Sequence, residues 1–152
     1  MKFNPHPYQT EAIDHALNKG QSILLMDCGL GKTVVTLSYL NQLFRNMLIK
    51  GALVVAPLRV ARLTWPLEID QWDHTDWMTY TFLHGPDKAE KLKEKKAIYL
   101  INYEGLPWLY EQLSTIPIKD WPFDTVVWDE LTRMKAHDSV RFRGIDLKSG
   151  RI

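Results

Sequence analysis

Gly29-Leu30-Gly31-Lys32-Thr33 lies between the apolar run of residues 22–26 and a helical pattern that extends from residue 32 to about residue 47. The order strand, glycine loop, helix is the context in which a phosphate-binding loop occurs. Glycines let backbone N–H groups turn toward phosphate oxygens, and the start of the following helix adds a positive dipole. In such a loop Lys32 can reach the β and γ phosphates, and the Thr33 hydroxyl can bind Mg²⁺. The stretch predicts a nucleotide-binding α/β protein.

The loop departs from the strict phosphate-loop pattern at one position. That pattern asks for Gly six residues before the Lys, and this chain has Met26 there. The alternative interpretation is an ordinary glycine turn followed by a lysine on a helix surface. The position of the loop between a strand and a helix favours phosphate binding.

Apolar runs and helical patterns alternate along most of the chain. Apolar runs that do not alternate with polar residues are typical of strands buried on both faces of a parallel sheet. The sequence therefore predicts an α/β fold, a three-layer α/β/α sandwich around a mainly parallel sheet. Ligands bind such sheets where the strands end, so chemistry is expected just after residues 26, 55, 83, 101 and 128. The predicted strands are 22–26, 52–56, 79–83, 97–101 and 125–128, and the predicted helices are 8–17, 32–47, 60–72 with a bend or first turn at Pro66, 88–96 and 106–113.

Two acidic residues follow the last predicted strand. Asp129 and Glu130 come directly after the apolar run of residues 125–128, at the end of the sheet where ligands bind. Hydrolysis at a phosphate loop needs a carboxylate on a neighbouring strand. Asp129 is predicted to hold the magnesium shell, and Glu130 to polarise the attacking water. The alternative is that the two acids begin a loop.

Composition restricts the class of protein. The chain has 152 residues, of which 45% are hydrophobic, which suffices for one domain with a core. No apolar window approaches the roughly 18 residues of a membrane span, and the first residues do not form a signal peptide. Cys28 is the single cysteine, so no internal disulfide is possible. We expect a soluble, cytoplasmic protein without a membrane partner.

Positive charge is concentrated near the end of the sequence. The whole chain has 19 basic and 18 acidic residues, and residues 133–152 contain 6 and 2 of them, which leaves 13 and 16 in residues 1–132. The last part is therefore basic (+4) and the rest mildly acidic (−3). A basic segment of this kind either binds phosphates or is ordered poorly without a neighbouring strand.

With the loop and the acid pair in this order, the sequence resembles superfamily 2 helicases, most closely the Swi/Snf-like branch and its phage members. Tyr8 and Gln9 look like the adenine-recognition segment of that family, and residues 27–33 look like its motif I, which itself lacks the first glycine. Residues 128–135 resemble motif II. The resemblance implies a RecA-like lobe with ATP and Mg²⁺ as cofactors, inside a bacterial or phage-infected cell. It assigns ATP to Tyr8, Gln9, Gly29, Leu30, Gly31, Lys32 and Thr33, and magnesium to Thr33 and Asp129, with Lys32, Asp129 and Glu130 as the catalytic set.

Two further segments resemble the motifs that line a nucleic-acid track. Residues 54–60 are similar to motif Ia, whose helix would carry Trp65, and residues 101–104 are similar to motif Ib. The resemblance implies that Pro57, Arg59, Asn102 and Tyr103 contact the backbone of nucleic acid, with double-stranded DNA favoured. Arg59 could instead be a surface residue of a helix start. Trp65 is expected to pack in the core or at an interface, as large aromatic residues mostly do, and the alternative is stacking on a base.

The chain departs from the family pattern in two places. Thr132 occupies the fourth position of motif II, where His or Asp is usual, and the sequence ends at Ile152, before motif III and the second lobe. We expect residues 1–135 to form the ATP-binding lobe and residues 136–152 a basic segment that leads toward motif III, so the fold would be incomplete at its C-terminus. The expected partner is a second RecA-like lobe or another chain. Without an arginine finger, worth about 10³–10⁵ in rate, the chain alone should hydrolyse ATP very slowly.

The sequence allows three hypotheses for the function of this protein. The first is the ATP-binding part of a Swi/Snf-like DNA-dependent ATPase. The second is a naturally short phosphate-loop protein that acts as a binding or interference module on a partner protein or on DNA. The third, a small nucleotide kinase, is the weakest, because a kinase needs a lid in place of the segments around Gln9 and Arg59. The reading frame after Ile152 separates the first two.

Overall fold

The computed structural model describes residues 1–19 and 30–130 of the chain. Their strands form one sheet: β1 (Ala52–Ala56), β2 (Tyr80–Phe82), β3 (Ile98–Asn102) and β4 (Thr125–Trp128). The strand order is β2-β3-β1-β4, and each neighbouring pair is parallel. Four of the predicted strands and their parallel arrangement are thus confirmed, and the predicted strand at 22–26 lies outside the described residues.

The predicted helices are confirmed, with small differences at their ends. They are α1 (Pro7–Lys19), α2 (Lys32–Arg45), α3 (Trp65–Gln71), α4 (Lys88–Lys93) and α5 (Leu106–Ser114). The prediction for α4 was too long by three residues, because Glu94 already has an extended backbone with ψ 141°. Short 3₁₀ turns at Tyr103–Gly105 and Ile118–Asp120 were not predicted.

The expected bend near Pro66 is a change of helix type. Residues Val60–Thr64 form a π-helix, and α3 begins immediately afterwards at Trp65. Pro66 lies in the first turn of α3, where a residue without an N–H is tolerated.

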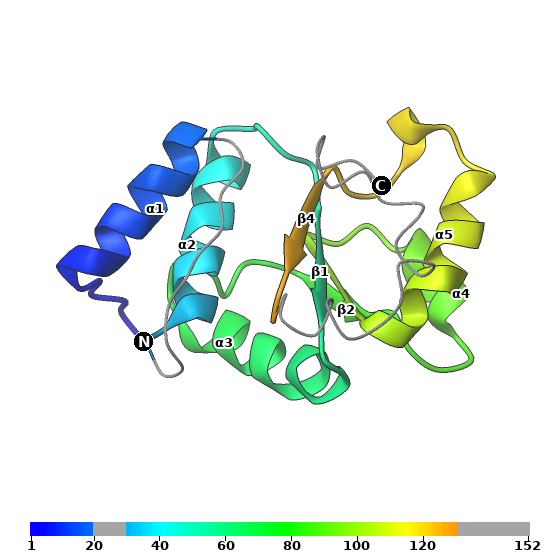
Figure 1. Cartoon of the computed structure of the whole chain (residues 1–152), viewed down its shortest axis with the longest axis horizontal. Helices are drawn as coiled ribbons and strands as arrows, with labels where there is room; N and C mark the ends of the chain where they lie inside the picture. The colour runs from blue at the N-terminus through cyan, green and yellow to red at the C-terminus, as the bar shows by residue number, and fades with distance from the viewer. Residues whose placement is uncertain (20–29, 131–152) are drawn as a thin grey trace.

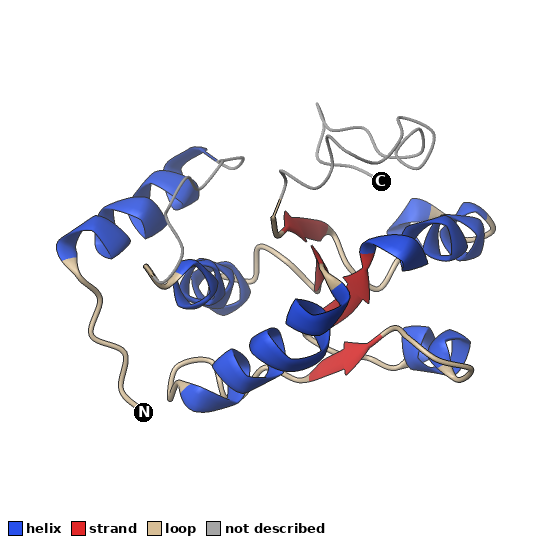
Figure 2. Cartoon of the chain, turned by 60° about the horizontal axis from the view of Figure 1, so that its bottom comes forward, coloured by secondary structure: helices blue, strands red, loops and turns tan. Residues whose placement is uncertain are grey.

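Helices cover both faces of the sheet, as Figures 1 and 2 show. On one face, Val54 and Leu100 pack with residues of α2 and α3, and on the other face Val55 and Ile101 pack with residues of α4 and α5. All five residues of β1 are fully buried. Burial of each large apolar side chain contributes about 1.5–3 kcal/mol, so β1 contributes substantially to the stability of the fold. The three-layer arrangement is confirmed.

The strand β4 is less buried than β1 and β3. β4 lies at the edge of the described sheet, and its four residues are half-buried, not fully buried as expected, because it pairs with β1 on one side. Among the described residues, every helix is too short or too polar to cross a membrane.

Candidate nucleotide site

The start of α2 requires a glycine. Gly31 precedes α2 with φ 76° and ψ 36°, a left-handed backbone conformation that favours glycine. A Cβ atom at this position would lie 2.7 Å from Nε2 of Gln9. Because glycine has no side chain, the backbone at Gly31 can pass close to Gln9 immediately before α2 begins. Gly29, the other predicted loop glycine, lies outside the described residues.

Gln9 joins the predicted adenine segment to this loop. Its Nε2 donates a hydrogen bond to the Leu30 carbonyl at 3.1 Å, and its Oε1 accepts one from the His6 backbone N–H at 2.8 Å. The side chain of Gln9 is 5% exposed. Tyr8, which is more exposed, donates from its hydroxyl to the same Leu30 carbonyl at 3.4 Å and stacks on the ring of His6. Two residues from the start of α1 thus hold one carbonyl of the loop.

Two of the predicted ligands, Lys32 for phosphate and Thr33 for phosphate and magnesium, lie in the first turn of α2. Lys32 and Thr33 are half-buried. Their side chains form no hydrogen bond or ion pair within residues 1–19 and 30–130. In Figure 1 this turn and the carboxyl ends of β1 and β4 lie toward the same, lower side of the molecule. The first turn of α2 therefore lies toward the end of the sheet where ligands were expected to bind.

Asp129 is fixed by contacts from three elements. Its backbone N–H donates to the Val55 carbonyl at 2.8 Å, which continues the pairing of β1 with β4. Its carboxylate Oδ2 accepts a hydrogen bond from Nε1 of Trp65 at 3.0 Å, and its carbonyl accepts one from the hydroxyl of Tyr103. The following residue, Glu130, has φ 57°, so the chain turns sharply where the acid pair stands. Oxygen ligands of this kind suit Mg²⁺, which is commonly bound through one or two carboxylates together with phosphate and water.

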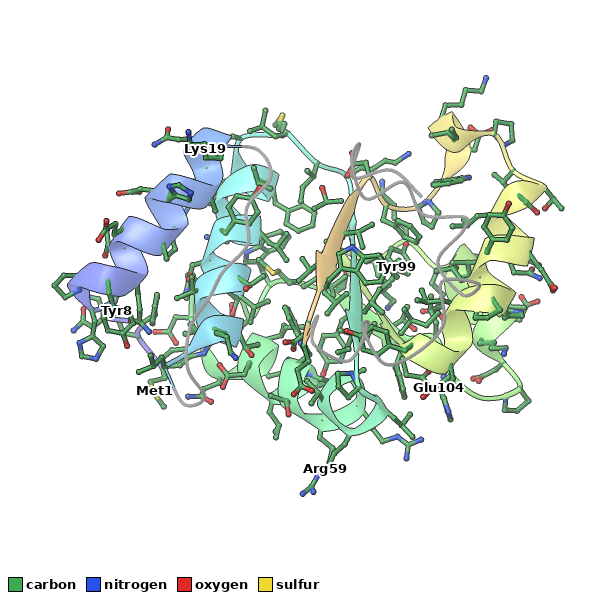
Figure 3. All side chains as sticks on the ribbon, in the orientation of Figure 1. Met1, Tyr8, Lys19, Arg59, Tyr99 and Glu104 are labelled. Atoms are coloured by element: carbon green, nitrogen blue, oxygen red, sulfur yellow. The ribbon has the colours of Figure 1, made fainter. Side chains whose placement is uncertain are left out.

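The residues predicted to contact nucleic acid differ in exposure. Arg59 is exposed, and Figure 3 shows its side chain extending away from the ribbon, while Pro57 is half-buried. Asn102 is 7% exposed, and its amide donates to Oε2 of Glu104 at 2.9 Å. Tyr103 is half-buried, with its hydroxyl at the carbonyl of Asp129. The exposed side chain of Arg59 can make an external contact, and the nucleic-acid role of all four residues stays a prediction.

Comparison with known proteins identifies the family. The family model of the SNF2-related domain matches residues 8–149, which is most of the chain. The chain belongs to the SNF2-related domain family. The match includes Gln9, Lys32, Trp65 and Asp129, and the resemblance to Swi/Snf-like helicases is therefore confirmed.

Several known proteins are similar in sequence to this SNF2-related chain. The chain is 38% identical over 138 residues to protein p41 of Acyrthosiphon pisum secondary endosymbiont phage 1, covering 88% of this chain and 29% of p41. It is 29% identical over 120 residues to human DNA excision repair protein ERCC-6-like, covering 75% of this chain and 9% of that protein. It is 34% identical to chicken chromodomain-helicase-DNA-binding protein 1 over 152 aligned residues, covering 89% and 8%. The chain spans less than a third of the length of each of these relatives.

A solved structure supports the same fold. A nuclease-deletion mutant of the Type ISP restriction-modification enzyme LlaGI, in complex with a DNA substrate mimic, matches with a TM-score of 0.57 and 18% identity. The similar region covers 90% of this chain and 16% of that enzyme. The α/β RecA-like fold of the SNF2-related lobe is confirmed.

The sequence did not reveal that Trp65 contacts the acid pair of this SNF2-related site. It was assigned to core packing, and packing is confirmed, because its side chain is 1% exposed and belongs to the core beside α2. Its indole N–H also reaches Asp129, which is 64 positions away in the sequence. The available signal was chemical: a buried indole N–H needs an acceptor, and the acids after β4 supply one.

A separate groove of the SNF2-related lobe lies beside the N-terminal segment. Its volume is about 340 Å³, and Phe3, Ser38 and His74 are among the residues that line it. Burial lowers the pKa of His74, while Asp73 and Asp76 act in the opposite direction. Ser38 donates its hydroxyl proton to the Val34 carbonyl at 2.7 Å, so its oxygen accepts from Nε2 of His74. Among the described residues, those predicted to bind nucleotide do not line this groove.

Proposed function

We propose that this chain binds Mg-ATP and the backbone of nucleic acid as the N-terminal lobe of a helicase or translocase. The observation that carries the proposal is the left-handed Gly31 at the start of α2, held close to Gln9. The first turn of α2 begins directly after Gly31, and a phosphate group beside the N–H groups of this turn would be stabilised by the helix dipole. Lys32 adds a positive charge at the same place.

The roles of the remaining residues follow from their chemistry. When bound, Mg²⁺ would supply positive charge that neutralises the phosphate oxygens. Thr33 would provide a hydroxyl ligand, and Asp129 would hold water molecules of the magnesium shell. Glu130 orients and polarises the water that attacks the γ phosphate. The second RecA-like lobe, or a partner chain, completes the site from the other side of the nucleotide.

Gln9 should make the site selective for adenine. Its amide has one N–H and one oxygen lone pair left after the contacts with Leu30 and His6. These match the N7 acceptor and the N6 donor of adenine. A guanine base has acceptors at both positions, so it leaves the oxygen of Gln9 without a donor.

The first test compares ATP with GTP in the wild-type chain and in Gln9→Ala. We expect Gln9→Ala to reduce the ratio of ATP affinity to GTP affinity by about tenfold or more, because an unpaired polar group costs about 1–3 kcal/mol. Calorimetry with Mg²⁺ measures both affinities. Gln42→Ala is the matched control, since Gln42 is exposed on α2, three turns from its start. Equal ratios in wild type and Gln9→Ala would refute the adenine assignment.

Nucleic-acid binding is proposed for the surface around Arg59. An exposed arginine at the end of β1 suits a phosphate, which gives binding without sequence preference. The names of two relatives, a DNA excision repair protein and a chromodomain-helicase-DNA-binding protein, favour DNA, and we propose that the DNA is double-stranded.

The Arg59 prediction concerns salt dependence. Arg59→Ala should weaken binding of a double-stranded oligonucleotide by up to about fivefold, because an exposed ion pair contributes at most about 1 kcal/mol. The slope of log affinity against log salt should fall by about 1. Fluorescence anisotropy at several salt concentrations measures both quantities. Arg45→Ala is the control: Arg45 lies in the last turn of α2, and its replacement should leave the slope unchanged. An unchanged slope in Arg59→Ala would exclude Arg59 from the DNA surface.

A further inference from the structure

The Asp129 carboxylate is held by a side chain that no substrate can touch. Trp65 is 1% exposed, and its Nε1–H donates to Oδ2 of Asp129 at 3.0 Å. The Asp129 backbone is fixed independently, through the Val55 carbonyl and the Tyr103 hydroxyl. Because the backbone is fixed, the hydrogen bond from the indole N–H sets the rotation of the Asp129 carboxylate.

We propose that Trp65 is a positioning residue for the magnesium shell. It occupies Oδ2 of Asp129 and so leaves Oδ1 to accept a hydrogen bond from metal-bound water. This inference rests on the proposed function, because it assumes that Asp129 serves Mg²⁺ when ATP is bound. Groups that orient metal ligands typically change metal affinity or activity by about 10–100-fold when they are removed.

The position of Trp65 explains why an indole serves here. Trp65 begins α3, directly after the π-helix Val60–Thr64, and packs in the core on the face of the sheet covered by α2 and α3. Its ring fills the space between α3 and the sheet, while its N–H reaches the end of β4. Phenylalanine would retain most of the packing but has no N–H. Trp65→Phe therefore separates positioning from packing.

The same helix offers a matched control. Trp72 follows α3, and its Nε1–H donates to Oε2 of Glu68 at 2.9 Å. Trp72→Phe thus removes an indole-carboxylate hydrogen bond of the same type, far from the acid pair. A general loss of stability would affect both variants, whereas loss of positioning affects Trp65→Phe alone.

The experiment measures how much Mg²⁺ strengthens ATP binding. Calorimetry of the 152-residue chain gives the ATP affinity with Mg²⁺ and with EDTA, and thermal melting verifies the fold of each variant. We expect Trp65→Phe to reduce the Mg²⁺ enhancement by about 10–100-fold, with the affinity in EDTA changed less than about twofold. Trp72→Phe should keep the wild-type enhancement.

A measurement on the wild-type chain covers the case in which Trp65→Phe does not fold. The indole N–H resonance of Trp65 should shift when Mg²⁺ is added to the ADP-bound chain, and that of Trp72 should not. The positioning role is overturned if folded Trp65→Phe keeps the wild-type Mg²⁺ enhancement of ATP binding. It is also overturned if the Trp65 resonance does not shift when Mg²⁺ is added. Either result leaves the proposed function intact. Failure of the wild-type chain to bind ATP at all refutes the proposed function, and the inference with it.

Discussion

Replacing Lys32 with alanine should weaken binding of Mg-ATP by about ten- to one-hundred-fold. The lysine is half-buried in the first turn of α2, where its ammonium group would face the β and γ phosphates. Hydrogen bonds to charged groups contribute about 1.5–3 kcal/mol, which corresponds to this loss of affinity. Because the phosphates would still meet the backbone N–H groups and the helix dipole, binding should be weakened and not abolished. Calorimetric titration with Mg-ATP measures the change.

Two further measurements make the Lys32 result specific. Lys95→Ala removes an exposed lysine outside the described helices and should leave the ATP affinity within twofold of wild type, roughly the precision of such titrations. The adenosine affinity of Lys32→Ala should also be normal, since adenosine has no phosphate for the lysine to bind. ATP affinity that does not respond to Lys32→Ala would mean that the nucleotide binds elsewhere.

Replacing Glu130 with glutamine should reduce ATP turnover by about 10²–10⁴-fold, the usual contribution of a general acid or base. Glutamine has the same shape but cannot accept a proton from water. Affinity for Mg-ATP should be retained, because Glu130 acts on the water and not on the nucleotide. Single-turnover hydrolysis with protein in excess over labelled ATP measures the rate, even if turnover is slow.

Control variants separate this effect from a change in the fold. Glu111→Gln alters an exposed carboxylate on α5 and should hydrolyse ATP at the wild-type rate. Glu130 has φ 57°, and glutamine disfavours that conformation about as much as glutamate does, so the melting temperature should change little. Normal turnover in Glu130→Gln would assign the water-activating role to another group.

The elements of the fold were largely predictable where burial decides them. β1 and β4 have the predicted bounds, because uninterrupted apolar runs such as Ala52–Ala56 become strands between two helical layers. The end of α4 was not predictable, since Glu94 continues the charged helical pattern while the chain must already turn toward β3. The π-helix was also missed, because its hydrogen bonding has no sequence signal apart from the nearby Pro66.

The candidate site was predictable in its local parts. Gly31 and Lys32 could be placed because strand, loop and helix follow one another in sequence, and Gln9 because the family resemblance includes it. The hydrogen bond from Trp65 to Asp129 could not be predicted, because it joins residues far apart in sequence that meet only when β1 and β4 pair. The burial of Asn102 was equally hidden: its place at the end of β3 was correct, but its side chain points to Glu104 within the fold.

Calorimetric titration of Mg-ATP into the wild-type 152-residue chain shows whether this lobe binds nucleotide. The geometry of Gly31, Lys32 and Asp129 predicts one ATP bound per chain, saturating below about 1 mM, the upper end of the usual range of substrate affinities. Binding should weaken when Mg²⁺ is removed. The absence of saturable binding up to that concentration, with the chain shown to be folded by thermal melting, would contradict the account.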